Sequence, residues 1–182
     1  MNKKIRRINL FGGPGVGKST ISAYLFYDLK MDNKHVELVQ EYVKGWAYEG
    51  RVPIGWDQLH LFTEQLRREE LLLRNGVDLI ISDSPIFLAA CYGKKNRVPV
   101  WRHLLKLAAC YEAKYPSFNV FLKRGANQFY EALGRYQTEE EARKMDDYVR
   151  RNIRSFGVRL DCCLDATLHN EIRMTVRRKL GW

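Results

Sequence analysis

The sequence predicts an α/β fold in which a five-stranded parallel sheet is flanked by helices. Short apolar runs alternate along the chain with longer segments of helical pattern, which is typical of a parallel sheet with helical crossovers. The chain has no repeat and no Ser/Pro-rich linker, and 46% of its residues are hydrophobic. A length of 182 residues suits one compact domain, which we expect to span residues 1–182.

In the first half of the chain, apolar runs before and after a glycine-rich turn give the first strand and the first helix. Further on, Asn75-Gly76 closes a helix, because glycine tolerates the left-handed cap conformation. The stretch between Glu41 and Asp57 contains Gly45, Gly50, Pro53 and Gly55 and is predicted to be irregular. The expected elements are strands at 6–11 and 35–40 and helices at 18–31 and 57–74.

In the second half, residues 77–82 form a nearly all-apolar run, the pattern of a strand buried on both faces. Thr138 and Glu141 have the spacing of a capping box, which predicts a helix start at that point. The other expected elements are helices near 86–92, 100–114 and 138–156, strands near 118–122 and 158–164, and a final basic helix.

The charge is strongly positive, with 31 Lys and Arg against 21 Asp and Glu. Residues 1–27 and 84–111 contain no acidic residue. Such a balance favours anionic partners. No apolar run approaches the length needed to cross a bilayer, and the basic N-terminus lacks a signal-peptide pattern, so we expect no membrane partner and a cytoplasmic protein with reduced cysteines.

The strongest motif is a glycine-rich loop between the first strand and the first helix. The segment GGPGVGKST fits G-x-x-x-x-G-K-[ST], whose backbone N–H groups converge on phosphate oxygens at a helix N-terminus. Lys18 is expected to reach the β- and γ-phosphates, and the Ser19 hydroxyl to bind Mg²⁺. The predicted nucleotide-binding residues are Gly12, Gly13, Gly15, Val16, Gly17, Lys18, Ser19 and Thr20.

Two carboxylates follow apolar strands whose carboxyl ends should converge on this loop. Asp83 ends the run at 77–82 in a Walker B arrangement and is a candidate to hold the metal or to accept a proton. Glu41 ends the second strand and is the other candidate general base. Asp78 begins its strand at the opposite end and is expected to be structural.

The helix predicted at 57–74 carries a polar row on one face. Gln58 and Gln65 are seven residues apart, and Arg68 lies one turn further. Amides and a guanidinium in a row could read the polar edge of a nucleobase, or could simply form a solvated helix face.

Together the segments GGPGVGKST, VQEY, DQLHLFTEQLRR, LIISDSP and FLKRGANQFYEALGRYQTEEEARKMDDYV resemble the P-loop kinase-like AAA domain of phage nucleotide-kinase-like proteins, akin to the kinase domain of nicotinamide riboside kinases. The resemblance spans roughly residues 5–165. It implies a P-loop NTPase/kinase fold with ATP and Mg²⁺ as cofactors. A subset of such proteins phosphorylates 5-hydroxymethyluracil within DNA.

The resemblance also implies a helical lid at roughly 124–150, in which Arg124 and Arg135 stabilise charge on the transferring phosphoryl group. One departure concerns Asp83, which is followed by Ser84-Pro85 where many nucleoside and nucleotide kinases have an arginine. The anchoring of an acceptor is therefore expected to fall on Lys94 or Arg97.

The sequence thus predicts an enzyme, a Mg²⁺- and ATP-dependent kinase. The acid-free segment 84–111 slightly favours DNA as the acceptor, because a phosphodiester backbone uses a basic flank for register. A free nucleoside or nucleotide is the alternative acceptor. A different class of function, a nucleotide-dependent switch or nucleic-acid-binding ATPase, is the second hypothesis.

Overall fold

The computed structural model describes residues 4–126, 128–131, 133 and 136–182. Its strands are β1 (Arg7–Phe11), β2 (Val36–Val39), β3 (Leu79–Ser82), β4 (Ser117–Lys123) and β5 (Cys162–Asp165). They form one sheet in the order β2-β3-β1-β4-β5, with every neighbouring pair parallel. The predicted five-stranded parallel sheet is confirmed.

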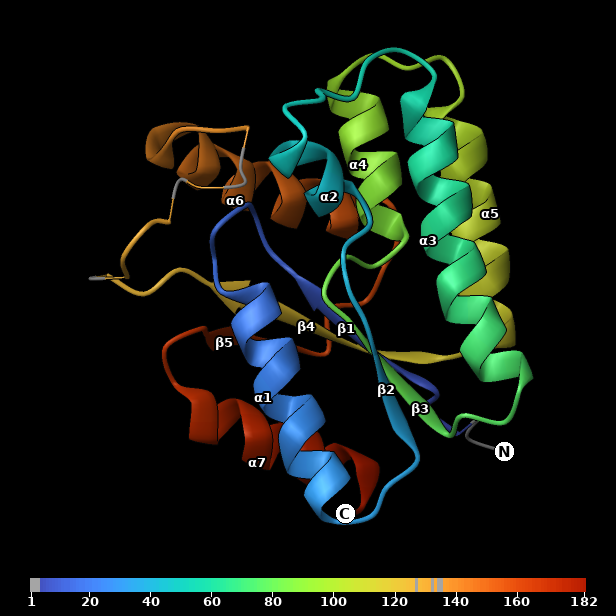
Figure 1. Ribbon diagram of the computed structural model, residues 1–182, viewed down its shortest axis with the longest axis vertical. Helices are drawn as coiled ribbons and strands as arrows, with labels where there is room; N and C mark the ends of the chain where they lie inside the picture. The colour runs from blue at the N-terminus through green and yellow to red at the C-terminus, as the bar shows by residue number, and fades with distance from the viewer. Residues whose placement is uncertain (1–3, 127, 132, 134–135) are drawn as a thin grey trace.

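Within the described residues six helices connect these strands, and a seventh, α7, follows β5 (Figure 1). Boundaries differ from the predicted ones by a few residues, as frayed ends and short strands allow. The helices are α1 (Lys18–Met31), α2 (Val43–Tyr48), α3 (Asp57–Arg74), α4 (Phe87–Lys95), α5 (Trp101–Lys114), α6 (Glu139–Ser155) and α7 (His169–Leu180).

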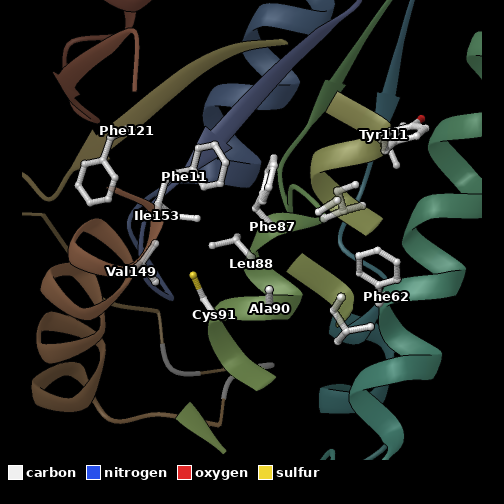
Figure 2. Packing of buried hydrophobic residues seen from close by; sticks show 14 of the residues in the cluster. Phe11, Phe62, Phe87, Leu88, Ala90, Cys91, Tyr111, Phe121, Val149 and Ile153 are labelled. Carbon is white, nitrogen blue, oxygen red and sulfur yellow. The ribbon is translucent and has the colours of Figure 1, made fainter. Parts of the chain in front are cut away.

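The helices cover both faces of the sheet, because each strand sends alternate side chains to opposite sides. On one face, Ile8 and Leu10 of β1 pack with apolar residues of α1 and α7. On the other, Phe11 packs with residues of α3, α4, α5 and α6. Figure 2 shows this second cluster, in which Leu88 and Cys91 of α4 lie close to Val149 and Ile153 of α6.

The prediction of an irregular stretch after β2 is wrong in its first part, where α2 forms. Trp46 is buried in this short helix, with an exposed fraction of 5%, although Gly45 precedes it. Burial of a large aromatic ring outweighs the roughly 1 kcal/mol that a glycine costs in a helix interior. The tertiary contact therefore overrides the local signal.

Helix α6 begins as predicted, with Thr138 and Glu141 forming a complete capping box. Its residues Met145, Val149 and Ile153 belong to the core cluster. The part of the predicted lid from 139 onwards is therefore packed into the domain.

A buried ion-pair network lies between the sheet and helices α3 and α5. The guanidinium of Arg7, at 0% exposure, donates to Glu69 and to Glu112 and lies over the ring of Tyr111. Glu69 in turn accepts a hydrogen bond from Ser82 at 2.9 Å, and burial raises the pKa of its carboxyl. This network links β1 and β3 to helices α3 and α5. Its member Ser82 directly precedes Asp83 in the sequence.

Among the described residues, no helix combines the length and the apolar character required to span a membrane.

Candidate functional site

The glycine-rich loop between β1 and α1 adopts a conformation that its glycines make possible. Gly12, Gly15 and Gly17 have φ values of 149°, 73° and 95°, in the region that side chains disfavour. Gly17 is the N-cap of α1. The Lys18 ammonium donates to the backbone carbonyls of Gly12 and Gly13, at 3.1 and 2.8 Å. The Lys18 side chain therefore folds over the loop. The phosphates of a nucleotide are expected to lie at this place.

Asp83 lies directly beside the loop, as the convergence of strand ends predicts. The Ser19 hydroxyl donates to Asp83 Oδ2 at 3.0 Å. Burial, and secondarily the charge of Glu41, raise the pKa of Asp83 to about 6, while the Ser19 hydrogen bond lowers it. Among the described residues Asp83 Oδ1 has no hydrogen-bond partner, although it is fully buried.

Glu41 reaches the same place from the end of β2. Its Oε1 accepts a hydrogen bond from the Ser84 hydroxyl at 3.3 Å. The carboxylates of Glu41 and Asp83 therefore lie in one region. Each accepts a hydrogen bond from a serine hydroxyl, Glu41 from Ser84 and Asp83 from Ser19.

A cavity of about 800 Å³ extends from the glycine-rich loop to the helices beyond β2 and β3. Gly15, Gly17, Lys18, Ser19 and Thr20 line one end of it, while Glu41 lies along its wall. The far wall is formed by α2, α3, α4 and the loop before α3, through Tyr42, Val43, Lys44, Ala47, Val52, Pro53, Ile54, Gly55, Gln58, Leu61, Gln65, Ser84, Pro85, Ile86, Leu88, Ala89, Tyr92 and Asn96.

Of the polar row predicted on α3, Gln58 and Gln65 line this cavity and Arg68 does not. Arg68 pairs with Glu64 at 3.3 Å and lies over the ring of Tyr42. Gln65 accepts a hydrogen bond at Oε1 from the backbone N–H of Tyr42, at 3.2 Å. The structure thus brings the two amides together with the glycine-rich loop and leaves the guanidinium outside.

Lys94 and Arg97 do not line the cavity either. The Lys94 ammonium donates to Asn152 Oδ1 at 2.7 Å and packs over the rings of Trp101 and Phe156. Arg97 is exposed in the turn after α4, with a positive φ of 55°. Arg135 lies outside the described residues.

The Arg124 side chain contacts the backbone of the glycine-rich loop. Its guanidinium donates to the carbonyls of Pro14 and Gly15 at 2.7 and 3.0 Å and pairs with Asp146 of α6 at 3.0 Å. Asp146 Oδ1 also accepts from the N–H of Gly13 at 2.8 Å. This arrangement, which we call the Arg124–Asp146 clasp, fixes the shape of the loop and occupies the arginine that was expected to act on the phosphoryl group.

A family model described as an AAA domain (AAA_28) matches residues 7–162. The chain belongs to this family. The AAA domain thus identified has the kinase-like P-loop fold, and the five sequence segments that carried the resemblance all lie inside the matched range. No curated protein matches the sequence.

Solved structures show the same fold at low sequence identity. A crystal structure of the NadR protein in complex with NAD and AMP-PNP aligns with a TM-score of 0.70 and 13% identity, and one of NadR in complex with NR with 0.69 and 14%. Each alignment covers 98% of this chain and 50% of the NadR chain, so the AAA domain spans about half the length of NadR. The crystal structure of APE1195 aligns at 0.55 with 19% identity over 98% of this chain and 95% of that one.

Sequence reasoning missed residues that the AAA domain places against the glycine-rich loop or the cavity. Asp146 gave no signal, because it is one of many charges on an amphipathic helix. Tyr136 lines the cavity and donates to the backbone carbonyl of Arg51 at 2.7 Å. Only the fold brings these segments to the loop, since they lie over 100 residues from it in the sequence.

Proposed function

We propose that this AAA domain is an ATP- and Mg²⁺-dependent kinase that transfers the γ-phosphoryl group to a hydroxyl of a free nucleoside-type acceptor. The observation that carries the proposal is the single cavity that joins Lys18 and Ser19 to Glu41 and to the amides of α3. A phosphoryl donor on the loop and an acceptor against the far wall would meet beside Glu41. Exclusion of water when both ligands fill the cavity would favour transfer to the acceptor over hydrolysis.

The donor end fits a nucleoside triphosphate with Mg²⁺. Lys18 and the loop amides would hold the β- and γ-phosphates, as in other P-loop enzymes. The Ser19 hydroxyl and the Asp83 carboxylate fit a hard cation, because Asp83 presents a buried oxygen without a partner among the described residues. When bound, Mg²⁺ neutralises charge on the phosphates. The AMP-PNP in the NadR structure, whose fold the chain shares, supports ATP as donor.

The positions of the two carboxylates support different roles for them. Glu41 lines the cavity, whereas Asp83 is buried behind Ser19. Glu41 would therefore accept the proton of the acceptor hydroxyl as that oxygen bonds to the γ-phosphorus and the bond to the ADP oxygen breaks. Asp83 would serve the cation.

The cavity wall favours a small neutral acceptor over a nucleotide or DNA. Besides Lys18, Lys44 is the only cationic residue that lines the cavity within the described part of the chain, and no arginine does. Phosphate groups are usually bound by arginine forks or clustered cations. None of the basic residues of the segment 84–111 lines the cavity itself, although Asn96, which lies between Lys95 and Arg97, does. The NR bound in the second NadR structure is in line with a nucleoside-type acceptor.

The test uses γ-³²P-ATP and Mg²⁺ with three acceptor pools: free nucleosides, free nucleotides, and DNA with or without 5-hydroxymethyluracil. We expect label on the nucleoside pool, and none with the Lys18→Ala variant. Label on modified DNA alone would replace the proposal with a DNA kinase. Acceptor-independent release of phosphate, with no labelled acceptor, would instead support a switch or ATPase.

A further inference from the structure

The side-chain amide of Gln65 is held in one orientation by the backbone. The N–H of Tyr42 donates to Gln65 Oε1 at 3.2 Å. A backbone N–H cannot accept, so this contact identifies the oxygen end of the amide. The Nε2 end must therefore be directed away from Tyr42.

Gln65 Nε2 is a buried donor without a partner. The side chain lines the cavity, with an exposed fraction of 5%, and Nε2 finds no hydrogen-bond acceptor in the part of the chain that the structure describes. Buried polar groups are normally paired, and an unpaired one costs free energy that a ligand can recover. Because Gln65 lines the cavity, a ligand seated there would supply the missing acceptor once a small rotation of the side chain exposes Nε2.

The surroundings of Gln65 suit a flat ring. Leu61 lies one turn before it on α3, and Ile86 and Leu88 line the same cavity from the segment after β3. Apolar side chains cover the faces of a nucleobase well, whereas ribose hydroxyls would lose hydrogen bonds against them. The polar edge of such a ring would then meet Gln65.

We propose that Gln65 is a specificity-determining residue that selects acceptors whose base presents a carbonyl oxygen, and rejects those with an amino group at that position. The inference rests on the proposed nucleoside acceptor and adds the class of base. An amino group would place donor against donor and leave both unpaired in a buried site. Sites that hydrogen-bond a substrate discriminate strongly for this reason.

The test compares two pairs of nucleosides in which an amino group replaces a carbonyl and the adjacent ring N–H becomes an acceptor nitrogen: uridine with cytidine, and inosine with adenosine. Binding is measured by calorimetry without ATP, and kcat/KM is measured with ATP. We expect the carbonyl member of at least one pair to be favoured about tenfold or more in both measurements.

Three variants test whether the Nε2 donor of Gln65 causes the preference. Gln65→Glu turns the donor into an acceptor while keeping an oxygen for Tyr42, so the preference should shift towards the amino member. Gln65→Met removes the donor without adding charge, so the preference should disappear, which covers the case in which the buried carboxylate prevents folding. Gln40→Glu adds the same charge to an exposed residue outside the cavity and should leave the preference unchanged.

The outcomes distinguish this inference from the proposed function. Transfer to nucleosides with no carbonyl preference, or a preference that Gln65→Met leaves intact, overturns the inference while the kinase stands. Selective binding of carbonyl nucleosides without transfer overturns the kinase and keeps the inference. Absence of any nucleoside binding overturns both.

Discussion

Replacing Asp83 with asparagine should make the ligand-free protein more stable at neutral pH. Burial and the charge of Glu41 raise the pKa of Asp83 from its usual value of 3.8 to about 6. The folded state therefore binds this proton more tightly than the unfolded state does. Below about pH 4 both states hold the proton and the residue costs nothing. As the pH rises through 6, the folded state must carry a buried charge and stability is lost.

The shift of about two pH units corresponds to about 3 kcal/mol, at about 1.4 kcal/mol per unit. Asparagine stays neutral and still offers an oxygen to the Ser19 hydroxyl, so Asp83→Asn should recover most of this free energy above pH 7. For a domain of this size that amounts to a rise in Tm of roughly 6 to 12 °C. At pH 4 the variant and the wild type should melt almost together.

The assay is thermal unfolding and urea unfolding, each followed by circular dichroism at pH 4 and pH 7.5, with a chelator and without nucleotide. Asp78→Asn is the matched control. The pKa of Asp78 is lowered, first by its hydrogen bond with Lys4, so its removal should not stabilise the protein at neutral pH. A stability difference for Asp83→Asn that is the same at both pH values, or a variant less stable than the wild type at pH 7.5, would refute the reasoning.

Three further predictions concern the loop, the base and the core. Lys18→Ala should reduce phosphoryl transfer at least about a hundredfold while the circular dichroism spectrum stays unchanged, because an electrostatic contact to the phosphates is lost; retained transfer would contradict the role. Glu41→Gln should lower kcat about 10²- to 10⁴-fold with little change in the KM for ATP, measured by steady-state kinetics, and an unchanged kcat would remove it as the base. Arg7→Met should cost about 3 to 5 kcal/mol in urea unfolding, because Glu69 is left buried without its cation; a loss below 1 kcal/mol would show that the network does not stabilise the fold.

The sequence places the residues around the glycine-rich loop correctly because each of them belongs to a short local pattern. Lys18 and Ser19 follow the glycines directly, and Asp83 and Glu41 each end an apolar run, so strand convergence alone places them together. The same local logic predicts the capping box of α6.

What the sequence could not supply is side-chain direction and pairing between distant segments. Lys94 follows the Walker B strand closely, yet the rings of Trp101 and Phe156 hold it against α6. Arg124 stands where a lid arginine is expected, but its partners at Pro14 and Asp146 exist only after β4 lies next to β1. Such contacts depend on packing that no local pattern encodes.

The two ends of the cavity come from different parts of the chain, which bears on how the proposed kinase would diverge. The donor end is built from β1, α1 and the Arg124–Asp146 clasp, whereas most of the far wall comes from two stretches of chain, 42–65 and 84–96. Point changes or loop insertions in those two stretches alter what is accepted without disturbing the parts that hold the donor. Under the proposed function, changes confined to a limited part of the sequence would give new acceptors, and duplicates that keep the same loop and clasp would phosphorylate unrelated compounds.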